Sequence, residues 1–82
     1  WFNIANYNTG IDAHSHPLAK TWEYVYYPLI NDDHPAIEFY IDDKWVSYPA
    51  KSGDWLRCAN YTIHRVPLNQ THTDRISMSF QI

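Results

Sequence analysis

The segment Arg75-Ile76-Ser77-Met78-Ser79-Phe80, near the end of the chain, alternates polar and apolar residues with a period of two. This period is typical of a β-strand, in which successive side chains point to opposite faces of a sheet. The arginine and the two serines therefore share one face, and the apolar residues between them share the other. We expect the polar face to line a cavity, and the apolar face to be covered by a partner subunit, as in a homo-oligomer, or by sequence outside this chain.

Short runs of β-branched and aromatic residues, separated by turn residues, make up the rest of the chain, and no window keeps a helical period. The sequence predicts an all-β protein with one helical turn, at Leu18–Thr21. Eight strands are expected, at Phe2–Tyr7, Ile11–His16, Trp22–Ile30, Ala36–Ile41, Lys44–Tyr48, Asp54–Ala59, Thr62–Pro67 and Arg75–Ile82. Aromatic strands with a turn every few residues favour a barrel or a sandwich.

Length and composition indicate a single folded domain over residues 1–82. The 82 residues are 45% hydrophobic and 17% aromatic, which excludes a disordered or low-complexity chain. The lone cysteine, Cys58, cannot form an internal disulfide, so oligomerisation or further sequence is expected to help stabilise so small a domain. Because the sequence starts at Trp1, the domain is either complete or a fragment of a longer chain.

The charge pattern limits the classes of partner. A net charge of −3 without a basic stripe argues against nucleic acid as the principal partner. The sequence shows no apolar run long enough to span a membrane, and we expect neither a membrane span nor a signal peptide. We therefore expect a cytoplasmic protein.

Three histidines are candidate metal ligands. His14 and His16 are two residues apart and share a strand face, and His64 lies on a later expected strand. Neutral imidazoles in such a set suit iron, zinc, copper or nickel. A chance His-x-His pair is the alternative in a chain with five histidines. His34 and His72 lie in polar loops, where we expect them to be solvated.

Arg75 and Ser77 form a candidate binding site for a carboxylate. The planar guanidinium of an arginine matches the fork of a carboxylate group, and a serine hydroxyl on the same face adds one more donor. The alternative is a surface arginine on an edge strand. Ten residues separate His64 from Arg75, and this interval favours the carboxylate site.

These residues resemble the Fe(II)/2-oxoglutarate-dependent oxygenases. The similar pattern is His14-Ser15-His16, then His64, then Arg75-Ile76-Ser77. Tyr26–Asp32 is similar to a strand of the aspartyl/asparaginyl β-hydroxylase-like and related phage and bacterial hydroxylase families. The resemblance covers most of the chain and implies a double-stranded β-helix, the jelly-roll or cupin-like barrel, with a minimal core of about eight strands.

Residue by residue, the resemblance implies that His14 and His64 are iron ligands and catalytic residues. The sequence departs from the family at His16, where most members have an aspartate or a glutamate. Either His16 or Asp12 would then be the third ligand. An all-histidine site carries one negative charge less than a site with a carboxylate ligand. Its iron would therefore be less electron-rich, which would change the affinity for iron and the turnover.

The resemblance further implies that Arg75 and Ser77 bind the distal carboxylate of 2-oxoglutarate, with a hydroxyl from Tyr26 or Tyr27. The expected activity is hydroxylation of an unidentified small molecule or protein side chain, with iron(II) as cofactor and 2-oxoglutarate as co-substrate. Four aromatic residues are candidate walls of the substrate site, with plain core residues as the alternative: Tyr24, Tyr26, Trp45 and Trp55.

Two other functions remain open. A cupin-type metal protein without 2-oxoglutarate would use His14, His16, Glu23 and His64 as ligands, although it would leave Arg75 without a role. A metal-free β-sandwich that binds a sugar or a peptide would instead leave the histidines scattered in space.

Overall fold

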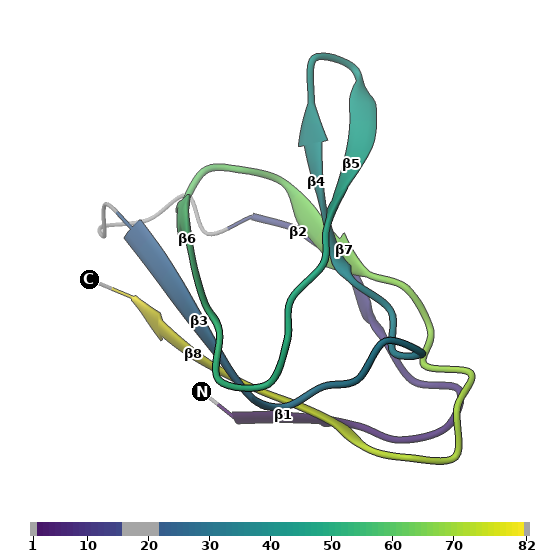
Figure 1. The fold of residues 1–82 in the computed structure, drawn as a ribbon. Helices are drawn as coiled ribbons and strands as arrows, with labels where there is room; N and C mark the ends of the chain where they lie inside the picture. The colour runs from purple at the N-terminus through teal and green to yellow at the C-terminus, as the bar shows by residue number, and fades with distance from the viewer. Residues whose placement is uncertain (1, 16–21, 82) are drawn as a thin grey trace.

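The computed structural model describes residues 2–15 and 22–81, which form eight β-strands and no helix (Figure 1). The strands are β1 (Phe2–Ala5), β2 (Ile11–His14), β3 (Trp22–Leu29), β4 (Ile37–Ile41), β5 (Lys44–Tyr48), β6 (Trp55–Ala59), β7 (His64–Val66) and β8 (Arg75–Gln81). The all-β prediction is confirmed, and most expected strands are shorter by one or two residues at an end. His16 and the expected helical turn at Leu18–Thr21 lie outside the described residues.

The strands form two four-stranded antiparallel sheets, with the orders β1-β8-β3-β6 and β2-β7-β4-β5. Pairing is nested along the chain: β1 pairs with β8, β2 with β7, β3 with β6 and β4 with β5. The two ends of the described chain therefore lie near each other, and the β4–β5 hairpin extends away from the other strands (Figure 1). Because of this nesting, residues far apart in sequence meet between the sheets.

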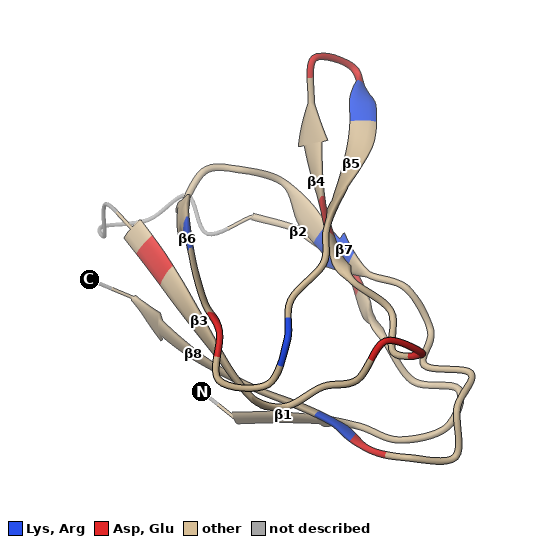
Figure 2. Ribbon diagram, in the orientation of Figure 1, with Lys and Arg blue, Asp and Glu red and all other residues tan. Residues whose placement is uncertain are grey.

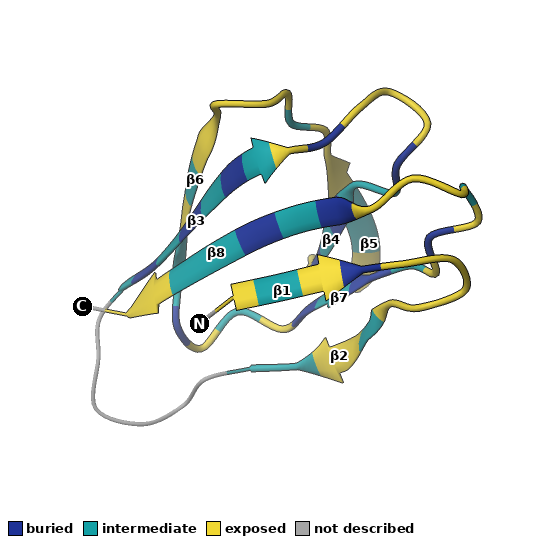
Figure 3. Cartoon of the chain, turned by 90° about the horizontal axis from the view of Figure 1, so that it is seen from below, coloured by how far each residue is buried: buried dark blue, intermediate teal, exposed yellow. Residues whose placement is uncertain are grey.

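The hydrophobic core lies between the two sheets. One cluster contains Val25, Tyr27 and Ile30, and the other contains Ile37, Phe39 and Val66. Leu56 packs against both clusters. Each large apolar side chain that is fully buried in this way contributes about 1.5–3 kcal/mol to folding. Figure 3 shows the resulting alternation of buried and partly exposed positions along β3 and β8.

Two tight turns depend on residues that accept unusual backbone geometry. Asp42 and Asp43 have φ values of 53° and 64°, and they connect β4 to β5 directly. Positive φ at both central residues is the mark of a type I′ hairpin turn, in which aspartate is well tolerated. In the β1–β2 connection, a Cβ at Gly10 would lie 2.6 Å from the carbonyl oxygen of Val66, so this position requires glycine.

The two faces of β8 are as the alternation predicts. Arg75 and Ser77 are 1% and 5% exposed and face the interior. Phe80 lies on the outer face, next to the neighbouring strand β1, whose Phe2 and Ile4 are 53% and 47% exposed. The outer face of this sheet is therefore apolar and remains open to solvent in the described part of the chain.

Charged residues are dispersed along the described chain (Figure 2). Many lie in the connections, such as Asp42 and Asp43 in the β4–β5 turn and Lys51 and Asp54 before β6. The described residues contain no helix that is long and apolar enough to cross a membrane.

Candidate functional site

A small polar cavity lies between the two sheets. Its volume is about 30 Å³, which accommodates an ion or one to two water molecules. The described residues around it are Ile11, His14, Glu23, Val25, Ile37, His64, Val66, Arg75, Ser77 and Ser79. Five of the residues assigned roles from the sequence, two histidines, one glutamate, one arginine and one serine, therefore surround one cavity.

His14 and His64 are brought together by the pairing of β2 with β7. They are opposite each other in the register, after an irregularity that follows Ile11. Such a bulge turns side chains relative to a regular ladder. The two imidazole rings are 4.3 Å apart between centroids and inclined by 60°. Residues separated by fifty positions thus provide adjacent imidazoles.

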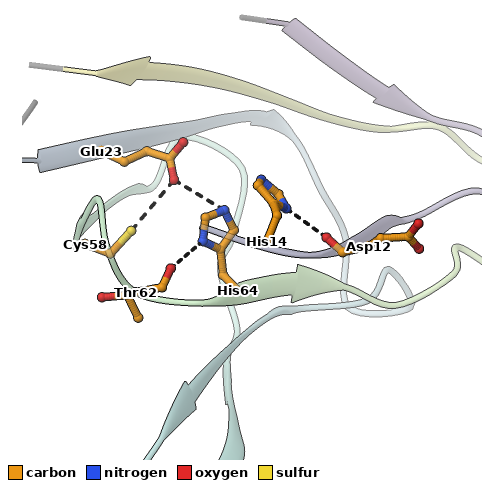
Figure 4. Close-up of polar contacts among 6 residues, drawn as sticks. All are labelled: Asp12, His14, Glu23, Cys58, Thr62 and His64. Carbon is orange, nitrogen blue, oxygen red and sulfur yellow. Dashed lines mark hydrogen bonds and ion pairs between the residues drawn. The ribbon is translucent and has the colours of Figure 1, made fainter. Parts of the chain in front are cut away.

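Hydrogen bonds of Nδ1 define the tautomer of each imidazole (Figure 4). Nδ1 of His14 is 2.8 Å from the carbonyl oxygen of Asp12, and Nδ1 of His64 is 3.0 Å from the carbonyl oxygen of Thr62. Because a carbonyl oxygen only accepts, each Nδ1 carries a proton and donates it. In the neutral imidazole this leaves a lone pair on Nε2, which is the arrangement found in many metal-binding histidines.

Glu23, from β3 of the opposite sheet, provides a buried carboxylate next to His64. Its side chain is 4% exposed, and its Oε1 lies 3.5 Å from Nε2 of His64. The thiol of Cys58 donates to the same oxygen over 3.8 Å. Burial, together with the negative charge of Glu23, raises the pKa of Cys58 to about 12, so that its sulfur keeps its proton at neutral pH.

The contact between Glu23 and His64 has a chemical consequence. With its proton on Nδ1, neutral His64 directs the lone pair of Nε2 toward a carboxylate, and two acceptors repel each other. The contact becomes favourable when Nε2 is protonated or when a cation lies between the two groups. The position is therefore suited to bind a positive charge.

Arg75, at the start of β8, places a second buried charge at the cavity. Its Nε donates to the carbonyl oxygen of Pro35 over 3.0 Å, and its guanidinium lies 5.3 Å from the centre of the Tyr27 ring. It forms no ion pair with a described residue. Burial lowers the pKa of Arg75, while Tyr27 opposes this shift. The guanidinium nevertheless stays charged at neutral pH, and a buried cation without a counter-ion among the described residues attracts an anion.

Of the two candidate tyrosines, Tyr27 is the one beside Arg75. Tyr27 is fully buried, and its hydroxyl has no hydrogen-bond partner among the described residues. Burial raises the pKa of this hydroxyl, although the positive charge of Arg75 acts in the opposite direction. Tyr26 instead faces outward and packs on Trp55, with 4.8 Å between ring centroids.

The other predicted ligands and walls lie elsewhere. His16 is outside the described residues. Asp12 is exposed, and Figure 4 shows its carboxylate turned away from the histidines, so it contributes only its carbonyl oxygen. Of the expected aromatic walls, Trp45 stacks under Arg65, 3.8 Å from its Cζ, and Tyr24 is opposite Phe80 on the outer side of its sheet.

One expectation about the remaining histidines is wrong. His34 is buried: its Nδ1 accepts the N–H of Asn31 at 3.0 Å, and its Nε2 contacts Thr73. These bonds join two loops, so the ring of His34 is buried although the sequence around it is polar. His72 is exposed, as expected, and stacks on Tyr7.

The metal-ligand set is incomplete in the described residues. Within residues 2–15 and 22–81, no three histidine, cysteine, aspartate or glutamate side chains are placed so that they could hold a metal ion. His14, Glu23 and His64 nevertheless have the donor types of a two-histidine, one-carboxylate site. The sequence predicts Glu23 as a ligand only for a cupin-type site. Glu23 is two residues before Val25 in β3 and shares its buried face, and this alternation is the signal that Glu23 points inward.

A second cavity, of about 270 Å³, lies on the Cys58 side of the site. No role in it was predicted from the sequence for its aromatic lining residues, Trp22, Phe39 and Tyr48.

Comparison of the chain with protein-family models gives no match, and comparison with curated proteins gives none either.

Proposed function

We propose that the chain is an Fe(II)/2-oxoglutarate-dependent oxygenase. The observation that carries the proposal is the cavity in which buried Arg75, without a counter-ion among the described residues, accompanies two adjacent imidazoles. Binding of a keto acid to iron needs two parts. One is a permanent cation, which attracts a carboxylate, and the other is a pair of metal-binding nitrogens.

The strand order supports a double-stranded β-helix for this chain. Nested pairing of the first strand with the last, the second with the seventh, and so on inward, is the pairing of a jelly roll. In this arrangement β2 and β7 are neighbours, which makes His14 and His64 adjacent. The start of β8 then brings Arg75 to the same interior.

The protein groups have distinct parts in the proposed reaction. Nε2 of His14 and of His64 would hold iron(II), with Glu23 providing a carboxylate beside them and His16 retained as a ligand predicted from the sequence. Arg75 and Ser77 would bind the distal carboxylate of 2-oxoglutarate. When bound, the iron supplies the oxidation chemistry, in which 2-oxoglutarate and O2 yield succinate and CO2 while the second oxygen atom enters a C–H bond of the substrate.

The volume of the cavity sets a condition on this proposal. A space of about 30 Å³ admits an ion and water but is too small for 2-oxoglutarate. The keto acid therefore binds only when lining residues move apart. Val25, Ile37 and Val66, which line the cavity with apolar side chains, are the residues expected to shift.

A second candidate, a cupin-type metal protein without 2-oxoglutarate, is favoured by one observation. Glu23 lies beside His64, where such a protein would need its glutamate ligand. It offers no function for the buried charge of Arg75, and for this reason we place it second. The metal-free binding module is less well supported, because it predicts scattered histidines and His14 contacts His64.

Tryptophan fluorescence during an anaerobic iron(II) titration distinguishes these functions. The proposed oxygenase predicts quenching at one equivalent of iron that tightens when 2-oxoglutarate is present, followed by succinate formation when oxygen is admitted. Quenching that is indifferent to 2-oxoglutarate would assign the chain to the cupin-type alternative. A complete lack of response to iron would contradict both metal-dependent functions.

A further inference from the structure

The second cavity, on the Cys58 side of the candidate metal site, is the larger of the two described here. It lies between β3 and β6 of one sheet and β4 and β5 of the other, and its volume is about 270 Å³. A volume of about 150 Å³ already admits one benzene ring, whereas drug-sized ligands occupy about 300–1,000 Å³. The cavity is therefore of the right size for a single ring with a short substituent.

The walls of this cavity contact the residues of the candidate metal site. Cys58 donates to Oε1 of Glu23, and the carbonyl oxygen of Thr62 accepts from Nδ1 of His64. Phe39 also lies against the ring of His64, with 5.9 Å between centroids. In Figure 4, Cys58 and Thr62 lie on one side of His64 and His14 lies on the other. A molecule in this cavity would thus be held next to the proposed metal.

The chemistry of the walls indicates what such a molecule carries. Phe39, Tyr48 and Leu56 offer apolar and aromatic surface, which favours a ring or a branched apolar group. The charged residue of the described lining is Arg57, whose Cζ lies 4.3 Å from the centre of the Trp22 ring. Arg57 forms no ion pair with a described residue, so its charge is available to an acidic group.

We propose that this cavity binds the substrate, and that the substrate is a small acid with a ring-sized apolar group. The apolar group enters between the sheets toward Cys58, and the acidic group stays at the rim with Arg57. The assignment as substrate rests on the proposed oxygenase function, whereas binding of such an acid to the cavity does not. The two statements can therefore be tested separately.

Binding is tested with phenylacetate on the metal-free protein, followed by NMR chemical-shift perturbation. We expect saturable shifts for the residues of the second cavity, with nuclear Overhauser effects between the phenyl protons and the side chains of Tyr48 and Leu56. Phenylacetamide, which has the same shape without the charge, should bind about fivefold more weakly, as expected for an exposed ion pair. Equal binding of the two compounds, or shifts located elsewhere, would overturn the proposal.

A matched pair of arginine variants tests the role of the charge. Arg57→Gln should weaken phenylacetate binding about fivefold and leave phenylacetamide binding unchanged. Arg65→Gln is the control, because Arg65 also stacks on a tryptophan, Trp45, but lies outside the cavity and is paired with Glu38. If the two variants have equal effects, Arg57 is not the anion-binding residue.

A third variant and a paramagnetic ion complete the test. Ala59→Leu should fill part of the cavity and abolish phenylacetate binding, while an unchanged backbone spectrum outside β6 would show that the variant is folded. Mn(II), an oxygen-inert stand-in for iron(II), should broaden the phenyl resonances of bound phenylacetate. Mn(II) binding without this broadening would overturn the substrate assignment alone, whereas the absence of Mn(II) binding would instead contradict the proposed oxygenase function.

Discussion

Oε1 of Glu23 lies 3.5 Å from Nε2 of His64, although the two residues belong to opposite sheets. The hydrogen bond from Nδ1 of His64 to a carbonyl oxygen directs Nε2 toward this carboxylate. The pair thus provides two electron-donating atoms at one end of a cavity whose other buried charge, Arg75, attracts anions. This separation of roles, with a cation site beside an anion site, underlies the following predictions.

Glu23→Gln should weaken iron(II) binding by about 10- to 100-fold, because it removes the negative charge next to His64. The amide can still hydrogen-bond to Nε2 of His64, so folding should be little affected. Calorimetric titration of iron(II) under anaerobic conditions measures the change. Glu38→Gln is the matched control, since Glu38 pairs with Arg65 away from the cavity. Equal affinities in the two variants would exclude Glu23 as a ligand.

Arg75→Ala should abolish the effect of 2-oxoglutarate on iron binding while leaving iron binding itself largely intact. It should also lower the free energy of unfolding by about 1–3 kcal/mol, because the carbonyl group of Pro35 loses its hydrogen bond. Fluorescence titration measures the first effect and urea denaturation the second. In the control Arg65→Ala, the response to 2-oxoglutarate should be retained. A normal response in Arg75→Ala would remove the carboxylate site from the account.

The thiol of Cys58 should react slowly and make the protein sensitive to alkali. A pKa near 12 in place of the ordinary 9.0 lowers the thiolate population, so alkylation at neutral pH should be roughly 100- to 1,000-fold slower than in the unfolded chain. Because the pKa is raised by folding, the unfolded thiol ionises first, and stability should fall as the pH rises above about 9 toward 12.

The variant Cys58→Ala isolates this contribution. Its free energy of unfolding, from urea denaturation at a series of pH values, should fall less steeply above pH 9 than that of the unmodified chain, since 9.0 is the ordinary pKa of the thiol. Parallel pH profiles for the two proteins would show that ionisation of Cys58 is not linked to folding.

The apolar outer face of the sheet that contains β8 should mediate self-association. Phe2, Ile4 and Phe80 are exposed on adjacent strands of this face, and burial of such a patch favours pairing with a second copy. Ile4→Glu should therefore dissociate the assembly in sedimentation equilibrium. Tyr61→Glu, which alters an exposed aromatic residue in a turn outside the sheets, should not. A monomeric mass for the unmodified chain at high concentration would contradict this expectation.

The strands and the faces of β8 could be predicted from the sequence because they depend on local alternation. The alternation in Arg75–Phe80 determines which side chains are buried, whatever the neighbouring strands are. The contact of His14 with His64 followed from a resemblance in spacing rather than from local physics. Its geometry depends on the pairing of β2 with β7, which no local pattern encodes.

Contacts between the sheets were harder to predict. Glu23 is one acidic residue among several, and only the packing of β3 over β7 makes it the neighbour of His64. Burial of His34 likewise results from Thr73, in a loop 39 positions further along the chain. The second cavity arises from the spacing of four strands, and its aromatic lining residues have no common period in the sequence.

The most direct test of the metal site is a histidine side-chain NMR spectrum recorded during titration with Zn(II), a diamagnetic stand-in for iron(II). The account predicts that Nε2 of His14 and of His64 bind the ion at one equivalent, while both Nδ1 atoms keep their protons. His34 and His72 should remain unchanged and serve as internal controls. Resonances of His14 and His64 that do not respond, or that respond only together with those of His34 and His72, would contradict a metal site between the two sheets.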